Sequence, residues 1–139
     1  MYSNIMVPVD LRHLDRLGKA LKTAADLARH YGAKVCYVGV TAETPGALAH
    51  NPEEYAAKLA DFAAAQSAEH GIEATSKPLA SHDPAIDLDH TLREAAEEIG
   101  SDLVVMATHM PNVTDYIWPS HGGRLATHSD ASVFLVRGN

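Results

Sequence analysis

The amino-acid sequence predicts an open α/β fold, in which a five-stranded parallel sheet of order 3-2-1-4-5 carries helices on both faces. Short continuous apolar runs recur along the chain, stripes of apolar residues with helical spacing lie between them, and the two kinds of segment alternate. The 139 residues, 46% hydrophobic and 21% charged, suffice for one globular core. We therefore expect a single domain over residues 1–139.

Four continuous apolar runs predict strands that are buried on both faces of the sheet. They span 5–9, 35–40, 103–106 and 133–136. A fifth candidate, 73–79, is polar and contains Pro78, and because proline removes a backbone donor we place this strand at an edge. This placement favours the order 3-2-1-4-5, with a switch point between the first and fourth strands.

Helical periodicity and capping residues mark the segments between the strands. The first helix carries an apolar stripe made of Leu17, Leu21, Ala24, Ala28 and Tyr31. Gly32 follows this stripe and is expected to end the helix. The second helix is expected to begin at Asn51 and Pro52, a cap residue before a proline in the first helical position, and to end at Gly71.

Two further helices are expected in the second half of the chain. The third begins in the same way, at Asp83-Pro84, and ends at Gly100. The loop 109–119 leads into a short fourth helix from near Ser120 to about His128. The free N–H groups at a helix start favour an anion, although the geometry alone favours Ser120 as a plain N-cap.

The carboxyl ends of the central strands are the expected ligand site, because ligands of open parallel sheets bind where the strand order reverses. In the first strand these ends fall at Pro8, Val9 and Asp10, in the second at Val40, and in the fourth at 106–109. Asp10 is placed either to accept a hydrogen bond from a ribose hydroxyl or to cap a turn.

Composition excludes several classes of function. The net charge of -7 and the low aromatic content of 6% argue against nucleic-acid binding and against attraction to anionic membranes. The single cysteine, Cys36, excludes an internal disulfide and cysteine-rich zinc sites, and we expect it to be buried and inert. The sequence carries neither a signal-peptide pattern nor an apolar run long enough for a membrane span, so we expect a cytoplasmic protein.

Three segments resemble the universal stress protein family. Residues 4–10 are similar to the family's first strand, residues 102–109 to its fourth strand, and the stretch to 132–137 to its last helix and strand. The resemblance covers the whole chain. It implies the fold shared with adenine nucleotide alpha hydrolases and a homodimer, with a tetramer of paired dimers left open. It also implies ATP or another adenine nucleotide, with or without Mg²⁺, at the carboxyl ends of strands 1, 2 and 4.

The resemblance also implies which residues carry these functions. The nucleotide-binding residues would be Pro8, Val9, Asp10, Val40, Met106, Ala107, Thr108, His109, Met110, Ser120, His121 and Gly122. The dimer would form through the last strand, over Ser132, Val133, Phe134, Leu135, Val136 and Arg137, because exposed edge strands invite pairing.

The glycine signature of the ATP-binding members is altered in this chain. Ala107, Met110 and Pro119 stand where those members carry glycine, and Pro119 also removes a backbone donor. The spacer between the last two positions is one residue shorter, as in the F/G-type subgroup, whose members can still bind adenine nucleotides. Two readings follow: a nucleotide-binding regulatory dimer, or a nucleotide-free protein-interaction module with an unknown partner.

No residue pattern indicates catalysis. A phosphoaccepting receiver domain would need an acidic pair after the first strand and a lysine after the fifth, where the chain has Asp10 alone and Arg137. His121 and His128 lie seven residues apart, which is not the spacing of a metal pair on a helix, so we expect no metal site. We expect a protein that is not an enzyme, with slow hydrolysis of bound ATP left open.

Overall fold

A computed structural model describes residues 1–42, 51–81, 84–107 and 130–137. The strands are β1 (Asn4–Val9), β2 (Lys34–Ala42), β3 (Ala74–Ser81), β4 (Leu103–Ala107) and β5 (Ser132–Val136). The helices are the 3-10 helix η1 (Leu11–Arg16) and the α-helices α1 (Gly18–Tyr31), α2 (Pro52–His70) and α3 (Pro84–Ile99). The strands form one parallel sheet of order β3-β2-β1-β4-β5, which confirms the predicted topology.

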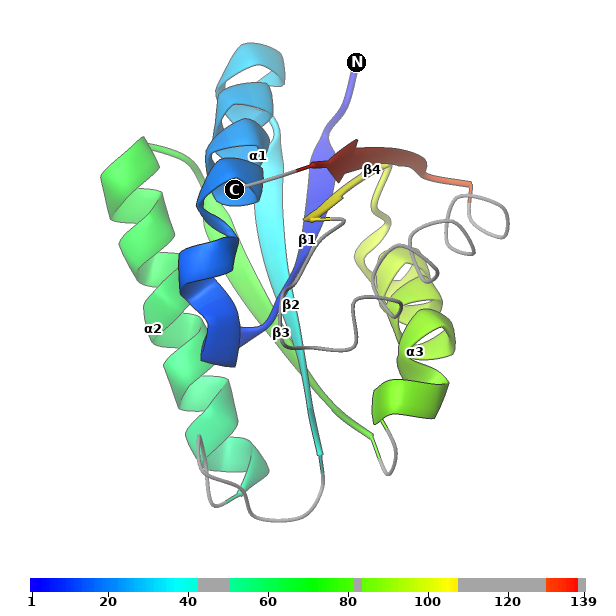
Figure 1. Cartoon of the computed structure of the whole chain (residues 1–139). Coiled ribbons are helices and arrows are strands. Elements are labelled where there is room, and N and C mark those ends of the chain that lie inside the picture. The colour runs from blue at the N-terminus through cyan, green and yellow to red at the C-terminus, as the bar shows by residue number, and fades with distance from the viewer. Residues whose placement is uncertain (43–50, 82–83, 108–129, 138–139) are drawn as a thin grey trace.

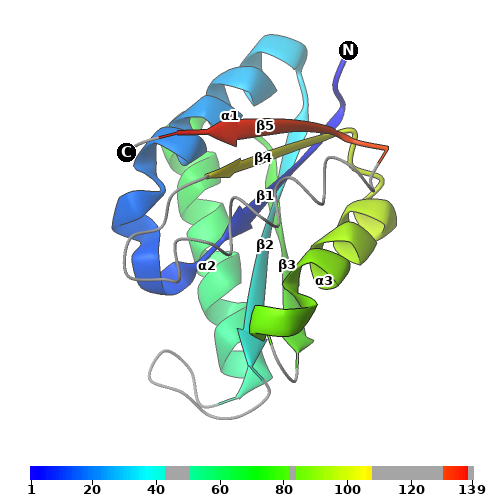
Figure 2. The same ribbon diagram turned by 45° about the vertical axis from the view of Figure 1, so that its right-hand side comes forward.

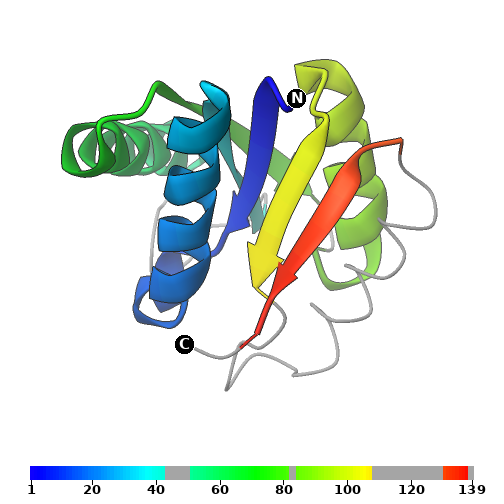
Figure 3. The same ribbon diagram turned by 90° about the horizontal axis from the view of Figure 1, so that it is seen from above.

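The helices cover both faces of this sheet. Seen from above, α1 and α2 lie on one side of the strands and α3 on the other (Figure 3). Figure 1 shows the chain passing from β1 through η1 into α1, which carries it back to the start of the parallel strand β2. The predicted edge position of the strand that contains Pro78 is correct, because β3 pairs only with β2 among the described strands.

The predicted helix ends are also confirmed. Gly32, Gly71 and Gly100 all have positive φ, at 65°, 63° and 71°, a conformation that glycine adopts without steric cost. At the start of α2, the side chain of Asn51 accepts a hydrogen bond of 2.7 Å from the backbone N–H of Glu54. The predicted helix from Ser120 to His128 lies outside the described residues.

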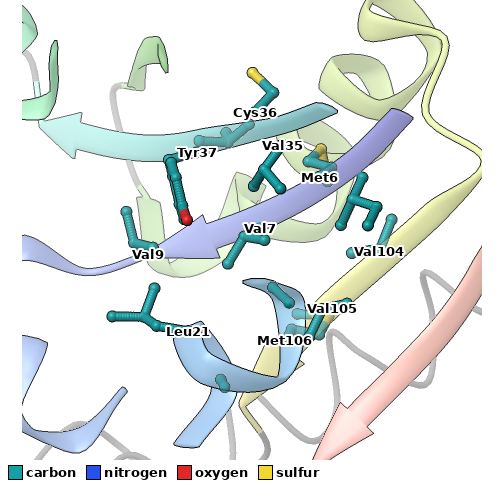
Figure 4. Close-up of a cluster of buried hydrophobic side chains, with 14 of the residues drawn as sticks. Met6, Val7, Val9, Leu21, Val35, Cys36, Tyr37, Val104, Val105 and Met106 are labelled. Carbon is teal, nitrogen blue, oxygen red and sulfur yellow. The ribbon is translucent and has the colours of Figure 1, made fainter. Parts of the chain in front are cut away.

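The core lies on both faces of the three central strands. All residues of β1 from Ile5 onward and all residues of β4 are buried, as continuous apolar runs predict. In Figure 4, Cys36 and Tyr37 point to opposite faces of β2, and Leu21 of α1 packs beside Val7 and Val9. Cys36 is 9% exposed, and burial raises the pKa of its thiol, which confirms the prediction that it is buried.

Candidate functional site

The carboxyl ends of β1 and β4 move apart at the predicted switch point. The β1–β2 ladder runs from Asn4 and Lys34 through to Val9 and Gly39. The β1–β4 ladder joins Ile5 to Leu103 and Met6 to Val104, at the beginning of both strands. In Figure 2 these two strands start close together and diverge towards their arrowheads. The sheet is therefore open where the order reverses, as ligand sites of this fold class require.

Asp10 lies directly after β1 and caps η1. Its Oδ1 accepts a hydrogen bond of 3.0 Å from the backbone N–H of Arg12, which confirms the interpretation of Asp10 as a cap. The Arg12 side chain completes the arrangement, with Nε donating to Oδ1 at 3.1 Å and Nη2 donating to Oδ2 at 3.2 Å. The Asp10 side chain is 12% exposed and that of Arg12 is 66% exposed. The carboxylate is thus mostly buried, whereas the guanidinium that pairs with it lies largely in solvent.

Tyr55 of α2 lies beside this ion pair. Its side chain crosses over Gly39 so closely that a Cβ atom on Gly39 would stand 2.2 Å from the tyrosine hydroxyl. Burial raises the pKa of Tyr55 to about 12, and the negative charge of Asp10 adds to this increase while Arg12 opposes it. The hydroxyl therefore remains protonated at neutral pH. Asp10, Arg12 and Tyr55 form a polar group at the carboxyl end of β1 and β2.

The sequence did not reveal Arg12 or Tyr55 as members of this group. One signal was available, because Gly39 interrupts an otherwise continuous apolar strand, and such a glycine often marks a close approach by another part of the chain. The sequence does not state which side chain makes that approach. The η1 turn that brings Arg12 back to Asp10 was likewise not predicted.

The other predicted nucleotide-binding residues divide into two sets. Pro8, Val9, Met106 and Ala107 are buried in β1 and β4, and Val40 is half-buried near the end of β2. Because those side chains belong to the core or its rim, a ligand would meet chiefly their backbone. Thr108, His109, Met110, Ser120, His121 and Gly122 lie outside the described residues.

The predicted dimer strand is exposed at the edge of the sheet. Phe134 and Leu135 are 44% and 40% exposed, high values for large apolar side chains. Ser132 and Arg137 are also exposed, whereas Val133 is half-buried and Val136 is buried against the core. The Nζ of Lys19 in α1 donates a hydrogen bond of 2.8 Å to the carbonyl oxygen of Arg137, which attaches the end of β5 to the body of the protein.

Two features of the described residues concern metal binding and membrane insertion. These residues contain no group of three or more histidine, cysteine or acidic side chains that could hold a metal ion. None of the helices in the same part of the chain combines the length and the apolar character that a bilayer span requires.

Comparison with known proteins agrees with the family resemblance of the sequence. The model of the Universal stress protein family matches residues 1–137. Universal stress protein G of Escherichia coli O157:H7 is 26% identical over 148 residues, which cover 99% of this chain and 100% of the relative.

Two solved structures share the fold. A universal stress protein in complex with cAMP has a TM-score of 0.69 and 17% identity, covering 99% of this chain and 98% of its own. The universal stress protein from Archaeoglobus fulgidus in complex with dAMP has a TM-score of 0.67 and 20% identity, covering 96% of this chain and 97% of its own.

Proposed function

Because the chain belongs to the universal stress protein family, we propose that it binds an adenine nucleotide at the carboxyl ends of β1, β2 and β4. In this proposal the protein is a regulatory homodimer and not an enzyme. ATP, with or without Mg²⁺, is included among the candidate nucleotides, and the proposed location is the cytoplasm. The two solved neighbours support the ligand class, since cAMP and dAMP share an adenine base and a phosphate.

The observation that carries the proposal is the hydrogen bonding of the Asp10 carboxylate at the open switch point. Its carboxylate accepts three recorded hydrogen bonds, all from Arg12. A carboxylate offers about four acceptor positions, so the described residues leave at least one for a further donor. A ribose hydroxyl is a donor of the right kind, and the 12% exposure of the side chain leaves a route to it.

Calorimetric titration tests this function directly. Protein stripped of endogenous ligand by unfolding and refolding would be titrated with AMP, cAMP, and ATP with and without Mg²⁺. We expect binding of at least one of these nucleotides and a loss of about tenfold in affinity in Asp10→Ala, the cost of one charge-assisted hydrogen bond. Asp15→Ala is the matched control, because Asp15 is an exposed carboxylate of the same helix, paired with Arg16 at 3.4 Å.

The outcomes separate the two readings of the family resemblance. Heat from no nucleotide would overturn the proposal and leave the nucleotide-free interaction module. Equal losses in Asp10→Ala and Asp15→Ala would contradict the placement of the site at Asp10.

The homodimer is proposed from the exposed apolar pair on β5. Phe134 and Leu135 lie on an edge strand, where a second copy of the chain would both cover them and extend the sheet. Light scattering at micromolar concentration should give the mass of a dimer, and Leu135→Lys should shift it towards the monomer. Ala80→Lys, on the exposed opposite edge strand β3, is the control that should leave the dimer intact. A monomeric wild-type protein would overturn this part of the proposal.

A further inference from the structure

The guanidinium of Arg12 has one edge paired with Asp10, and no hydrogen bond from a described residue occupies the other edge. The edge formed by Nε and Nη2 faces Asp10, at 3.1 and 3.2 Å from its two carboxylate oxygens. For Nη1, on the opposite edge, no hydrogen bond is recorded within the described part of the chain. A guanidinium carries five N–H donors in a fixed planar fork, so side-on pairing with one carboxylate leaves donors for a second oxyanion.

The surroundings of Arg12 keep this fork in one place. The backbone N–H of Arg12 donates to the same Asp10 oxygen as its own Nε, so the main chain and the side chain are tied to one anchor. Tyr55 packs beside the pair from α2 and is 3% exposed. The side chain itself is 66% exposed at the edge of the sheet where the nucleotide is proposed to bind. A cation that is anchored but faces solvent can bind an anion at little cost, because its side chain needs little further ordering.

The charge of the whole chain favours a local cation wherever an anionic ligand binds. The chain carries a net charge of -7, so a nucleotide phosphate is repelled by the protein as a whole. Among the residues that the structure describes at the carboxyl end of β1, Arg12 is the cation in direct contact with Asp10, the residue predicted to bind the ribose. A planar fork also pairs with two oxygens of one phosphate at once.

We propose that Arg12 is the phosphate-binding residue of the nucleotide site, oriented by its pairing with Asp10 through one edge while the other edge binds the ligand's phosphate oxygens. The inference rests on the proposed function and deepens it, because it assigns the ligand class to nucleotides over nucleosides. Asp10 binds the ribose and Arg12 binds the phosphate, so two residues that are two positions apart in the chain contact two parts of one ligand.

Adenosine and AMP distinguish the two roles, since they differ only in the phosphate. In calorimetry, wild-type protein should bind AMP more tightly than adenosine by about tenfold or more, the effect of a charge-assisted bidentate contact. Arg12→Gln should lose that advantage while its affinity for adenosine changes less than about threefold, and Arg12→Lys should keep part of it. The affinity of wild type for AMP should fall with added salt, and this dependence should weaken in Arg12→Gln.

Arg16→Gln is the matched control for charge and position. Arg16 lies on the same helix η1 and pairs with Asp15 at 3.4 Å, away from Asp10, so this variant should keep the preference for AMP. Thermal melts of all variants check that they fold. Stable variants are expected because Arg12 is exposed and Arg16 is only half-buried.

Each result decides between the proposals. AMP binding that is the same in Arg12→Gln as in wild type overturns the phosphate role alone and leaves the nucleotide site standing. Equal losses for AMP and adenosine in Arg12→Gln also overturn it, because they reduce Arg12 to a support for Asp10. If wild type binds neither ligand, the proposed function fails together with this inference.

Discussion

Two aspartates at opposite ends of the sheet show how differently the same side chain is used. At the amino end, the carboxylate of Asp102 accepts hydrogen bonds from the backbone N–H groups of Ser3 at 2.9 Å and Asn4 at 3.0 Å, which lie 99 and 98 residues away in the chain. At the carboxyl end, Asp10 accepts its bonds from Arg12, two residues away. Asp102 joins distant segments, whereas the hydrogen bonds of Asp10 within the described residues stay inside its own turn.

The remaining contacts at the amino end strengthen this contrast. The Nδ2 of Asn4 donates to the carbonyl oxygen of Gly100 at 3.2 Å, and the hydroxyl of Tyr2 donates to Oγ of Ser132 at 3.1 Å. Tyr2 also packs edge-on against Tyr31, with ring centroids 5.3 Å apart. The amino end is therefore closed by long-range contacts, whereas the described residues show only the local Asp10–Arg12 pairing and its neighbour Tyr55 at the carboxyl end of β1.

High pH should produce the largest loss of stability, through Tyr37 and Tyr55. Burial raises the pKa of both hydroxyls from 10 to about 12, and the Tyr37 hydroxyl has no hydrogen-bond partner within the described residues. Because the pKa values are higher in the folded state, this stability is complete below pH 10 and is lost as the pH rises towards 12. At about 1.4 kcal/mol per unit of pKa, each tyrosine contributes roughly 3 kcal/mol.

Denaturant unfolding at pH 9 and at pH 12 measures this effect in wild type, Tyr37→Phe and Tyr55→Phe. Each variant should remove about half of the loss caused by these two groups. If only Tyr37→Phe did so, Tyr55 would be hydrated, and the carboxyl end would be more open than its contacts with Gly39 indicate.

Asp102→Ala should come next, with a loss of about 3 kcal/mol in the free energy of unfolding. The substitution removes two charge-assisted hydrogen bonds and leaves the N–H groups of Ser3 and Asn4 without their partner. Urea denaturation measures the loss, and hydrogen exchange should show that protection decreases first at the start of β1. A loss below about 1 kcal/mol would mean that the two ends of the sheet are not as different as Asp102 and Asp10 indicate.

Gly39→Ala should cost about 2 kcal/mol, because the new Cβ would stand 2.2 Å from the Tyr55 hydroxyl and force the side chain of Tyr55 to shift. Adding Tyr55→Phe should restore part of the stability, since the nearest remaining ring atom lies 3.0 Å from the Cβ position. A double-mutant cycle of thermal melts measures this coupling. Strictly additive effects would show that Tyr55 does not lie over Gly39, and the polar group at the carboxyl end would lose one member.

Most of the fold could be predicted because its determinants are local in the sequence. The continuous apolar strands, the proline in β3 and the glycines after α1, α2 and α3 each act within a few residues of their own position. Right-handed crossovers and the polar edge strand then leave few possible orders of the strands in the sheet. The position of Asp10 at the switch point could be predicted from the same pattern, because Asp10 directly follows the apolar run that forms β1.

The rest of the candidate site depends on contacts that sequence patterns do not encode. Arg12 reaches Asp10 because η1 turns back after β1, and Tyr55 reaches Gly39 across 15 intervening residues, from a different element. Such pairs depend on rotamers and on the packing of α2 against the sheet. Of the predicted site, Asp10 and the strand ends are placed by the structure, whereas the phosphate-side residues between Thr108 and Gly122 stay predictions.

Asp10→Ala should have the smallest effect on stability, about 1 kcal/mol, which is the ordinary cost of a lost helix cap. The only backbone N–H that its carboxylate is recorded to hold within the described residues is that of Arg12, and the exposed Arg12 side chain returns to solvent without penalty. Urea denaturation of Asp10→Ala beside Asp102→Ala measures the difference. Similar losses in the two variants would assign Asp10 to the framework of the fold. A small loss combined with weakened nucleotide binding would assign it to the ligand, because the substitution would then act on the binding site and not on the stability of the fold.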